Sequence, residues 1–114
     1  MRRASSWARA SALLAALLVL APLAGRAEPA RARQSELRAM LDQDCGSCHG
    51  LTRKGGLGPA LLPDRLAGRS DADLIAVILN GSAAQPMPPW GFLIDAEDAA
   101  WLVAELRRGV ADDE

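Results

Sequence analysis

The chain has 114 residues, of which half are hydrophobic, and its formal net charge is −1. This length corresponds to one small domain. Basic residues do not outnumber acidic ones, so nucleic acid and anionic lipid are not expected as partners.

The first 27 residues resemble an export signal. Arg2, Arg3 and Arg9 precede an apolar run at residues 10–23, and small residues follow up to Ala27. We predict a signal peptide at residues 1–27, cleaved after Ala27, and a periplasmic mature protein. The apolar run is short for a membrane span, so we expect no stable membrane insertion after cleavage. An uncleaved anchor is the alternative.

Cleavage leaves 114 − 27 = 87 residues, with 9 basic and 14 acidic side chains and a net charge of 9 − 14 = −5. A domain of this size buries only about 60–65% of its unfolded surface, so its core is limited. A large apolar prosthetic group would add to that core. The negative charge favours a protein partner with a basic docking patch.

Residues 28–34 are expected to form a flexible lead-in, and the domain proper is expected at residues 35–109. Ser35 is a suitable N-cap for the first helix. Leu37, Leu41 and Cys45 follow at i, i+4 and i+8 and define one apolar face. This helix is predicted to carry the next motif.

Residues 45–49 read Cys-Gly-Ser-Cys-His, the attachment pattern of a c-type haem. Thiols two residues apart add to the two vinyl groups of one haem. The imidazole that follows becomes the proximal ligand of the iron. His49 is the single histidine of the chain. The motif predicts covalent attachment through Cys45 and Cys48 and iron ligation by His49.

A lone pair of cysteines at this spacing has other interpretations. A thioredoxin-like redox pair is usually found in a βαβ context, and no strand pattern precedes Cys45. A zinc site needs about four ligands, whereas this motif supplies three. A disulfide is the third alternative.

Residues 50–63 are rich in glycine and lack a helical period, which predicts a loop. A flexible connection is the simplest interpretation. In a haem protein, the carbonyl of Pro59 is the candidate acceptor for the second ring nitrogen of His49.

Two more helices are predicted. Ser70 caps the first, which ends at Asn80-Gly81 and is expected to pack in the core. Asp95 caps the second, which ends at Gly109. Residues 110–114 are expected to form an acidic tail.

Between these helices, prolines at 86 and 88 flank Met87 and restrict its backbone. Met1 is removed with the signal, and Met40 lies on the helix that leads to His49. Met87 is therefore the candidate distal iron ligand. A thioether opposite an imidazole raises the reduction potential. With both axial positions filled, the expected chemistry is one-electron transfer and not enzymatic catalysis.

These motifs, in this order, resemble the class I cytochrome c family. The resemblance implies an all-α fold of three to five short helices around one covalently bound haem c, with the first and last helices crossing. The family often carries an aromatic residue in the last turn of its final helix, where this chain has Glu105. Trp101 lies one turn earlier.

The chain is also similar to the cytochrome c-55X group. The similarity lies in residues 45–50, 56–61 and 87–90. It implies electron donation to cytochrome cd-type nitrite reductase in denitrification, or a part in haem d maturation. A haem-based sensor of small ligands is a further alternative. Trp90 is a candidate donor to a haem propionate.

Overall fold

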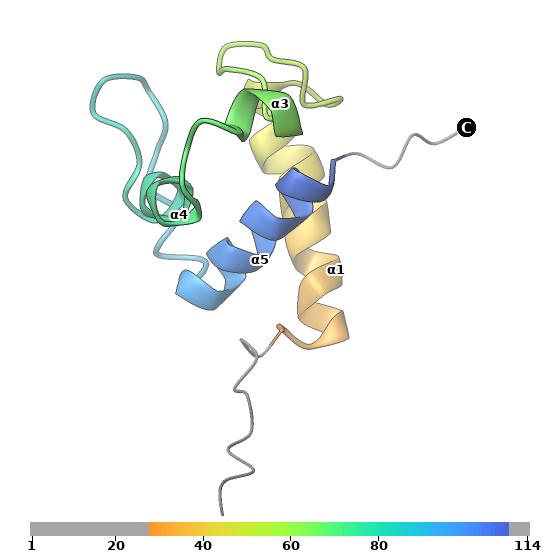
Figure 1. Cartoon of the computed structure of the whole chain (residues 1–114). Coiled ribbons are helices and arrows are strands. Elements are labelled where there is room, and N and C mark those ends of the chain that lie inside the picture. The colour runs from red at the N-terminus through yellow and green to blue at the C-terminus, as the bar shows by residue number, and fades with distance from the viewer. Residues whose placement is uncertain (1–27, 110–114) are drawn as a thin grey trace, which may run out of the picture.

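The computed structural model describes residues 28–109, and Figure 1 shows their arrangement. The predicted signal peptide and acidic tail lie outside these residues. The regular elements of the described part are helices: α1 (Arg31–Met40), η1 (Leu41–Cys45), α2 (Gly46–His49), α3 (Pro63–Leu66), α4 (Asp71–Asn80) and α5 (Ala96–Arg108). The prediction of an all-α fold is confirmed for this part of the chain.

The first helix begins at Arg31, so the predicted start at Ser35 and the flexible lead-in through residue 34 were wrong. No side chain caps this end. Contacts with the rest of the chain hold it instead. The Gln34 side chain donates to the Pro29 carbonyl at 2.8 Å, and the Arg33 guanidinium donates to Asp98 at 2.6 and 3.1 Å.

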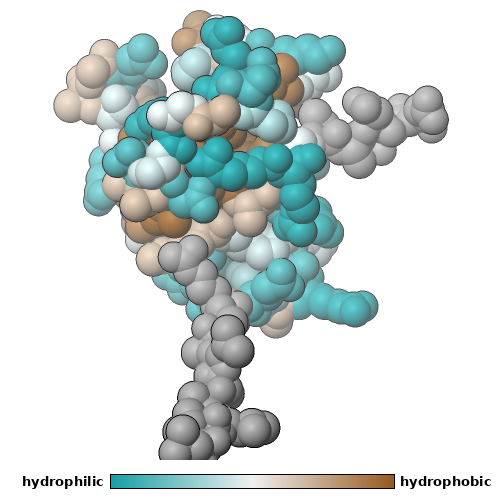
Figure 2. Space-filling model, viewed as in Figure 1, coloured by the Kyte–Doolittle hydropathy of each residue, from teal (hydrophilic) through white to brown (hydrophobic). Residues whose placement is uncertain are grey.

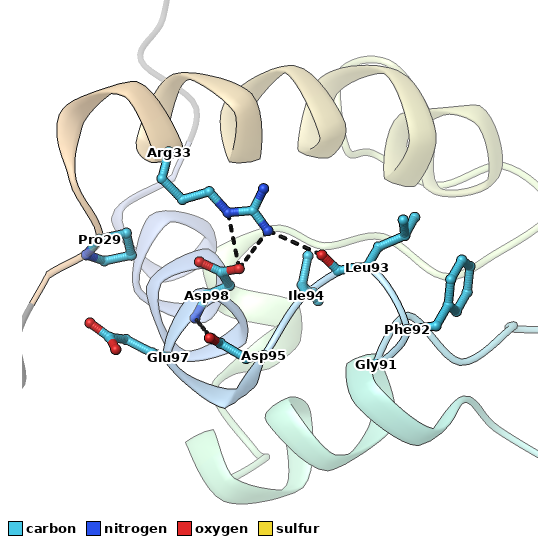
Figure 3. A pocket seen from close by; sticks show the side chains of 9 residues that line it. All are labelled: Pro29, Arg33, Gly91, Phe92, Leu93, Ile94, Asp95, Glu97 and Asp98. Carbon is cyan, nitrogen blue, oxygen red and sulfur yellow. Dashed lines mark hydrogen bonds and ion pairs between the residues drawn. The ribbon is translucent and has the colours of Figure 1, made fainter.

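The Arg33–Asp98 pair lies where the start of α1 meets the start of α5, beside a surface pocket (Figure 3). Arg33 also donates to the Leu93 carbonyl at 3.1 Å, so one guanidinium joins three segments. None of the predicted haem-site residues lines this pocket.

Helix α1 continues without a break through η1 into α2. Residues Leu41–Cys45 form a π-helical turn immediately before the rest of the attachment motif. Such turns are uncommon and are often found at functional sites. The helix thus reaches His49, the last residue of the attachment motif.

The predicted caps of the two later helices are present. The Ser70 hydroxyl accepts from the Asp73 amide at 3.1 Å, and the Asp95 carboxylate accepts from the Asp98 amide at 2.9 Å. Gly81 and Gly109 end α4 and α5 with φ values of +73° and +85°. These positive φ values explain why glycine is suited to both positions.

Helices α1 and α5 cross in the middle of the molecule, and α4 packs against α5 (Figure 1). The side chains of Leu37, Leu102 and Val103 are almost completely buried at this crossing. Arg38 covers the edge of the crossing, with its guanidinium 5.2 Å from the ring centroid of Trp101 and an ion pair to Glu105 at 3.4 Å. Glu105 thus holds a cation that lies over the aromatic ring.

The short helix α3 was not predicted: its first residue, Pro63, was expected to end the preceding loop, and no element was predicted for residues 64–66. Pro63 occupies its first turn, where the missing proline N–H costs nothing. Leu66 at its end is buried in the core. Within residues 28–109, no helix has the length and apolar character needed to cross a bilayer.

Candidate haem site

The attachment motif lies at the end of the long first helix, with its three side chains in different environments. Cys45 is partly buried and packs against the core, whereas Cys48 is exposed. Both thiols are free. The His49 side chain is buried.

The imidazole of His49 is held by the loop that follows it. Its Nδ1 atom lies 2.7 Å from the carbonyl oxygen of Pro59, as predicted. A carbonyl only accepts, so Nδ1 carries the proton and donates. The lone pair then resides on Nε2, the atom that remains for a metal.

Gly58 has a role that sequence reasoning missed. A Cβ atom at this position would lie 2.8 Å from Cε1 and 2.9 Å from Nδ1 of His49. The backbone therefore packs directly on the ring, and only glycine leaves the space. The Gly-Pro pair was the signal available in the sequence, but the contact with the ring depends on the fold.

Two backbone hydrogen bonds fix this loop to the motif. The Gly58 amide donates to the Cys48 carbonyl, and the Gly55 amide donates to the His49 carbonyl, both at 2.8 Å. The loop is thus folded back on the end of α2. The two bonds fix the position of the loop relative to Cys48 and His49, which belong to the attachment motif.

The environment of Cys45 argues against a thioredoxin-like redox pair. Burial, together with the nearby Asp44 carboxylate, raises the pKa of the Cys45 thiol to about 11. Reactive cysteines of redox pairs have lowered pKa values, since the thiolate is the nucleophile. Among residues 28–109, no three His, Cys, Asp or Glu side chains are grouped as metal ligands.

Met87 lies half-buried on the loop that joins α4 to the turn before α5. Its carbonyl accepts from the Ser82 amide at 3.1 Å, and its amide donates to the Gln85 carbonyl at 2.7 Å. A Cβ atom on Gly81 would lie 2.6 Å from the Met87 carbonyl oxygen. The loop is thus closed tightly on itself at Met87. In Figure 1 it projects from the same upper end of the molecule as the loop that carries Pro59.

Trp90 follows this loop and fixes its far end. Its amide donates to the Ile78 carbonyl at 2.9 Å, and its side chain packs against the core. Its ring stacks on Phe92 with centroids 6.5 Å apart. The predicted contact of Trp90 with a propionate stays a prediction.

The chemistry of the residues present fits a covalently bound haem. Two free thiols and one imidazole with its Nδ1 atom already occupied are the groups that attachment requires. Several apolar residues are also left only partly buried, and hydrophobic residues reach the surface among hydrophilic ones (Figure 2). Those that pack against the core are Met40, Cys45, Leu61, Ile75, Ile78, Leu79 and Trp90.

Comparison with known proteins agrees with this site. Residues 32–104 match the family model described as cytochrome C oxidase, cbb3-type, subunit III. The chain is 50% identical to cytochrome c55X of Pseudomonas aeruginosa over 95% of its own length and 91% of that protein. It is 51% identical to cytochrome c55X of Paracoccus denitrificans, over 83% of this chain and 93% of that protein.

Two solved structures are also similar. A c-type cytochrome named NirC has 52% sequence identity and a TM-score of 0.68, covering 70% of this chain and 94% of its own. Dihydro-heme d1 dehydrogenase NirN in complex with DHE has 36% identity and a TM-score of 0.61. That match covers 68% of this chain but only 17% of the dehydrogenase.

These similarities bear out the predicted class I cytochrome c fold and a single covalently bound haem c. They also bear out electron transfer as the activity. The chain belongs to the c-type cytochromes described by the matching family model and, within them, to the cytochrome c55X family of monohaem electron carriers.

Proposed function

We propose that this protein is a periplasmic carrier that passes single electrons to a cytochrome cd-type nitrite reductase in denitrification. The observation that carries the proposal is the hydrogen bond of 2.7 Å between His49 and Pro59 at the end of the attachment helix. It fixes the orientation of the imidazole and leaves its Nε2 atom available beside two thiols. This arrangement suits a haem whose iron stays ligated through both redox states.

In this proposal Cys45 and Cys48 attach the haem, and the Nε2 atom of His49 is the proximal ligand. Met87 supplies the distal thioether, and Trp90 donates to a propionate. The bound haem contributes a reversible one-electron couple. With His49 and Met87 both holding the iron, no position would be left on it for a substrate.

The proposed partner follows from the family and the charge. The resemblance to cytochrome c-55X implies an association with cytochrome cd-type nitrite reductase, and one similar structure bears the name NirC. After removal of residues 1–27 the chain has 9 basic and 14 acidic side chains. A basic patch on the reductase would attract an acidic carrier. The main effect of this attraction would be a faster association rate.

A second candidate function is a part in the maturation of haem d. The similarity to dihydro-heme d1 dehydrogenase, 39% identity over 68% of this chain, favours it. A dehydrogenase removes two electrons from its substrate. A monohaem cytochrome could accept these electrons one at a time.

Stopped-flow mixing of the reduced protein with oxidised nitrite reductase separates the two functions. We expect fast, saturable oxidation of the cytochrome that becomes slower as salt is added. A slow reaction that does not saturate would contradict the carrier function. Fast reduction of the oxidised cytochrome by a dihydro-haem d dehydrogenase and its substrate would then support the maturation function.

A further inference from the structure

Arg53 lies in the loop between His49 and Pro59, and its backbone conformation is unusual. Its φ is 60°, the one positive φ among the non-glycine residues of the described chain. A residue with a Cβ atom adopts this conformation at a cost, so it persists where surrounding contacts hold it. At Arg53 these contacts come from both the backbone and the side chain.

The backbone of Arg53 joins the two ends of the loop. Its amide donates to the Gly50 carbonyl at 2.9 Å, directly after the attachment motif. Its carbonyl accepts from the Leu61 amide at 2.8 Å. Leu61 is two residues beyond Pro59, so this bond lies next to the carbonyl that holds His49.

The side chain of Arg53 joins the loop to the π-helical turn. Its guanidinium pairs with the Asp42 carboxylate at 2.7 Å. The Arg53 side chain is only 12% exposed, and its Nε atom is buried without an acceptor among residues 28–109. The pair with Asp42, whose own side chain is 61% exposed, is therefore the ion pair of this partly buried cation. Asp42 belongs to η1, the turn that ends at Cys45.

We propose that Arg53 is a positioning residue of the haem site. Its guanidinium pairs with Asp42 and its carbonyl accepts a hydrogen bond from the Leu61 amide, so it connects the loop that carries Pro59 to the turn that carries Cys45. We call this connection the tie. The tie keeps the Pro59 carbonyl on Nδ1 of His49. This inference rests on the proposed ligation of the iron by His49.

The tie has a consequence for electron transfer. A carbonyl that accepts from Nδ1 makes the imidazole a more basic ligand and favours ferric iron. If the tie is removed, the hydrogen bond opens more often and the imidazole becomes less basic. The reduction potential of the haem then rises.

The test uses the mature protein with its haem attached and two pairs of variants matched in charge. Asp42→Asn and Arg53→Gln each remove one partner of the tie. Asp44→Asn and Lys54→Gln make the same charge changes at exposed neighbours that form no ion pair within residues 28–109. Differences within each pair then report on the tie and not on net charge.

The first readout is hydrogen exchange of the His49 Nδ1 proton, followed by NMR. We expect exchange to be about tenfold faster in Asp42→Asn and Arg53→Gln than in their controls, because the loop opens locally. The amide of Leu102, in the core helix α5, should exchange at the same rate in all four variants. Equal acceleration at Leu102 would mean a purely structural role and would overturn the proposal.

The second readout is the reduction potential. Relative to its matched control, each tie variant should shift the potential upward. Shifts of opposite sign in the two pairs would show an effect of local charge alone and would overturn the proposal. If the His49 signal of the wild-type protein lacks a haem-induced shift, the ligand assignment itself fails. The wild-type spectrum thus separates that failure from a failure of the tie.

Discussion

The Nδ1 atom of His49 lies 2.7 Å from the carbonyl oxygen of Pro59, ten residues further along the chain. The bond is possible because Gly58 leaves the space beside the ring empty. The carbonyl of Pro59 and the close packing of Gly58 thus define the orientation of the imidazole.

Replacing Gly58 with alanine should disturb this orientation. The new Cβ atom would lie 2.8 Å from Cε1 of His49, so the ring or the loop must move. We expect a changed reduction potential and a loss of about 1–3 kcal/mol in the free energy of unfolding, as is typical of overpacking. Spectroelectrochemistry and denaturant titration measure the two effects.

Gly68→Ala is the matched control, because a Cβ atom there has no neighbour within 4 Å. It should leave both quantities near their wild-type values. Equal effects of the two substitutions would contradict the proposed contact between Gly58 and the ring.

Preventing haem attachment should leave a poorly folded chain. Replacing Cys45 and Cys48 together with alanine removes both thiols. A covalently held haem buries several hundred square ångströms, which contributes on the order of 10 kcal/mol. Circular dichroism should show a large loss of helix in this variant. A cooperative unfolding transition like that of the wild-type protein would show that the haem is not part of the core.

Asp98 should stabilise the packing of α1 on α5. Its carboxylate accepts two hydrogen bonds from Arg33 and is only 10% exposed. Asp98→Ala should cost about 1.5–3 kcal/mol of unfolding free energy, the range for hydrogen bonds to charged groups. Chemical denaturation followed by circular dichroism measures the loss.

The control for this prediction is Glu36→Gln, which removes the other carboxylate paired with Arg33. Glu36 is 64% exposed, so its loss should cost at most about 1 kcal/mol. A larger loss from Glu36→Gln than from Asp98→Ala would be inconsistent with the burial of the two carboxylates.

Features that depend on neighbouring residues could be predicted from the sequence. Ser70 and Asp95 cap their helices through side chains that bond three residues ahead. Gly81 and Gly109 end the same helices because each adopts a positive φ. The attachment motif and the acceptor role of Pro59 also follow from short spacings.

Features that depend on residues distant in sequence could not be predicted. The early start of α1 at Arg31 is supported by a pair with Asp98, which is 65 residues away from Arg33. The steric role of Gly58 appears only when the loop folds back on α2. The ion pair between Arg53 and Asp42 likewise joins side chains that are 11 residues apart, one in a loop and the other in η1.

The most direct measurement is the near-infrared spectrum of the ferric protein in the wild type, Met87→Ala and Met40→Leu. With Met87 as the distal ligand, the wild type and Met40→Leu should show the sulfur-to-iron charge-transfer band. Met87→Ala should lack this band, and its ferrous form should bind carbon monoxide at neutral pH. A band that persists in Met87→Ala would contradict the proposed ligand pair of His49 and Met87.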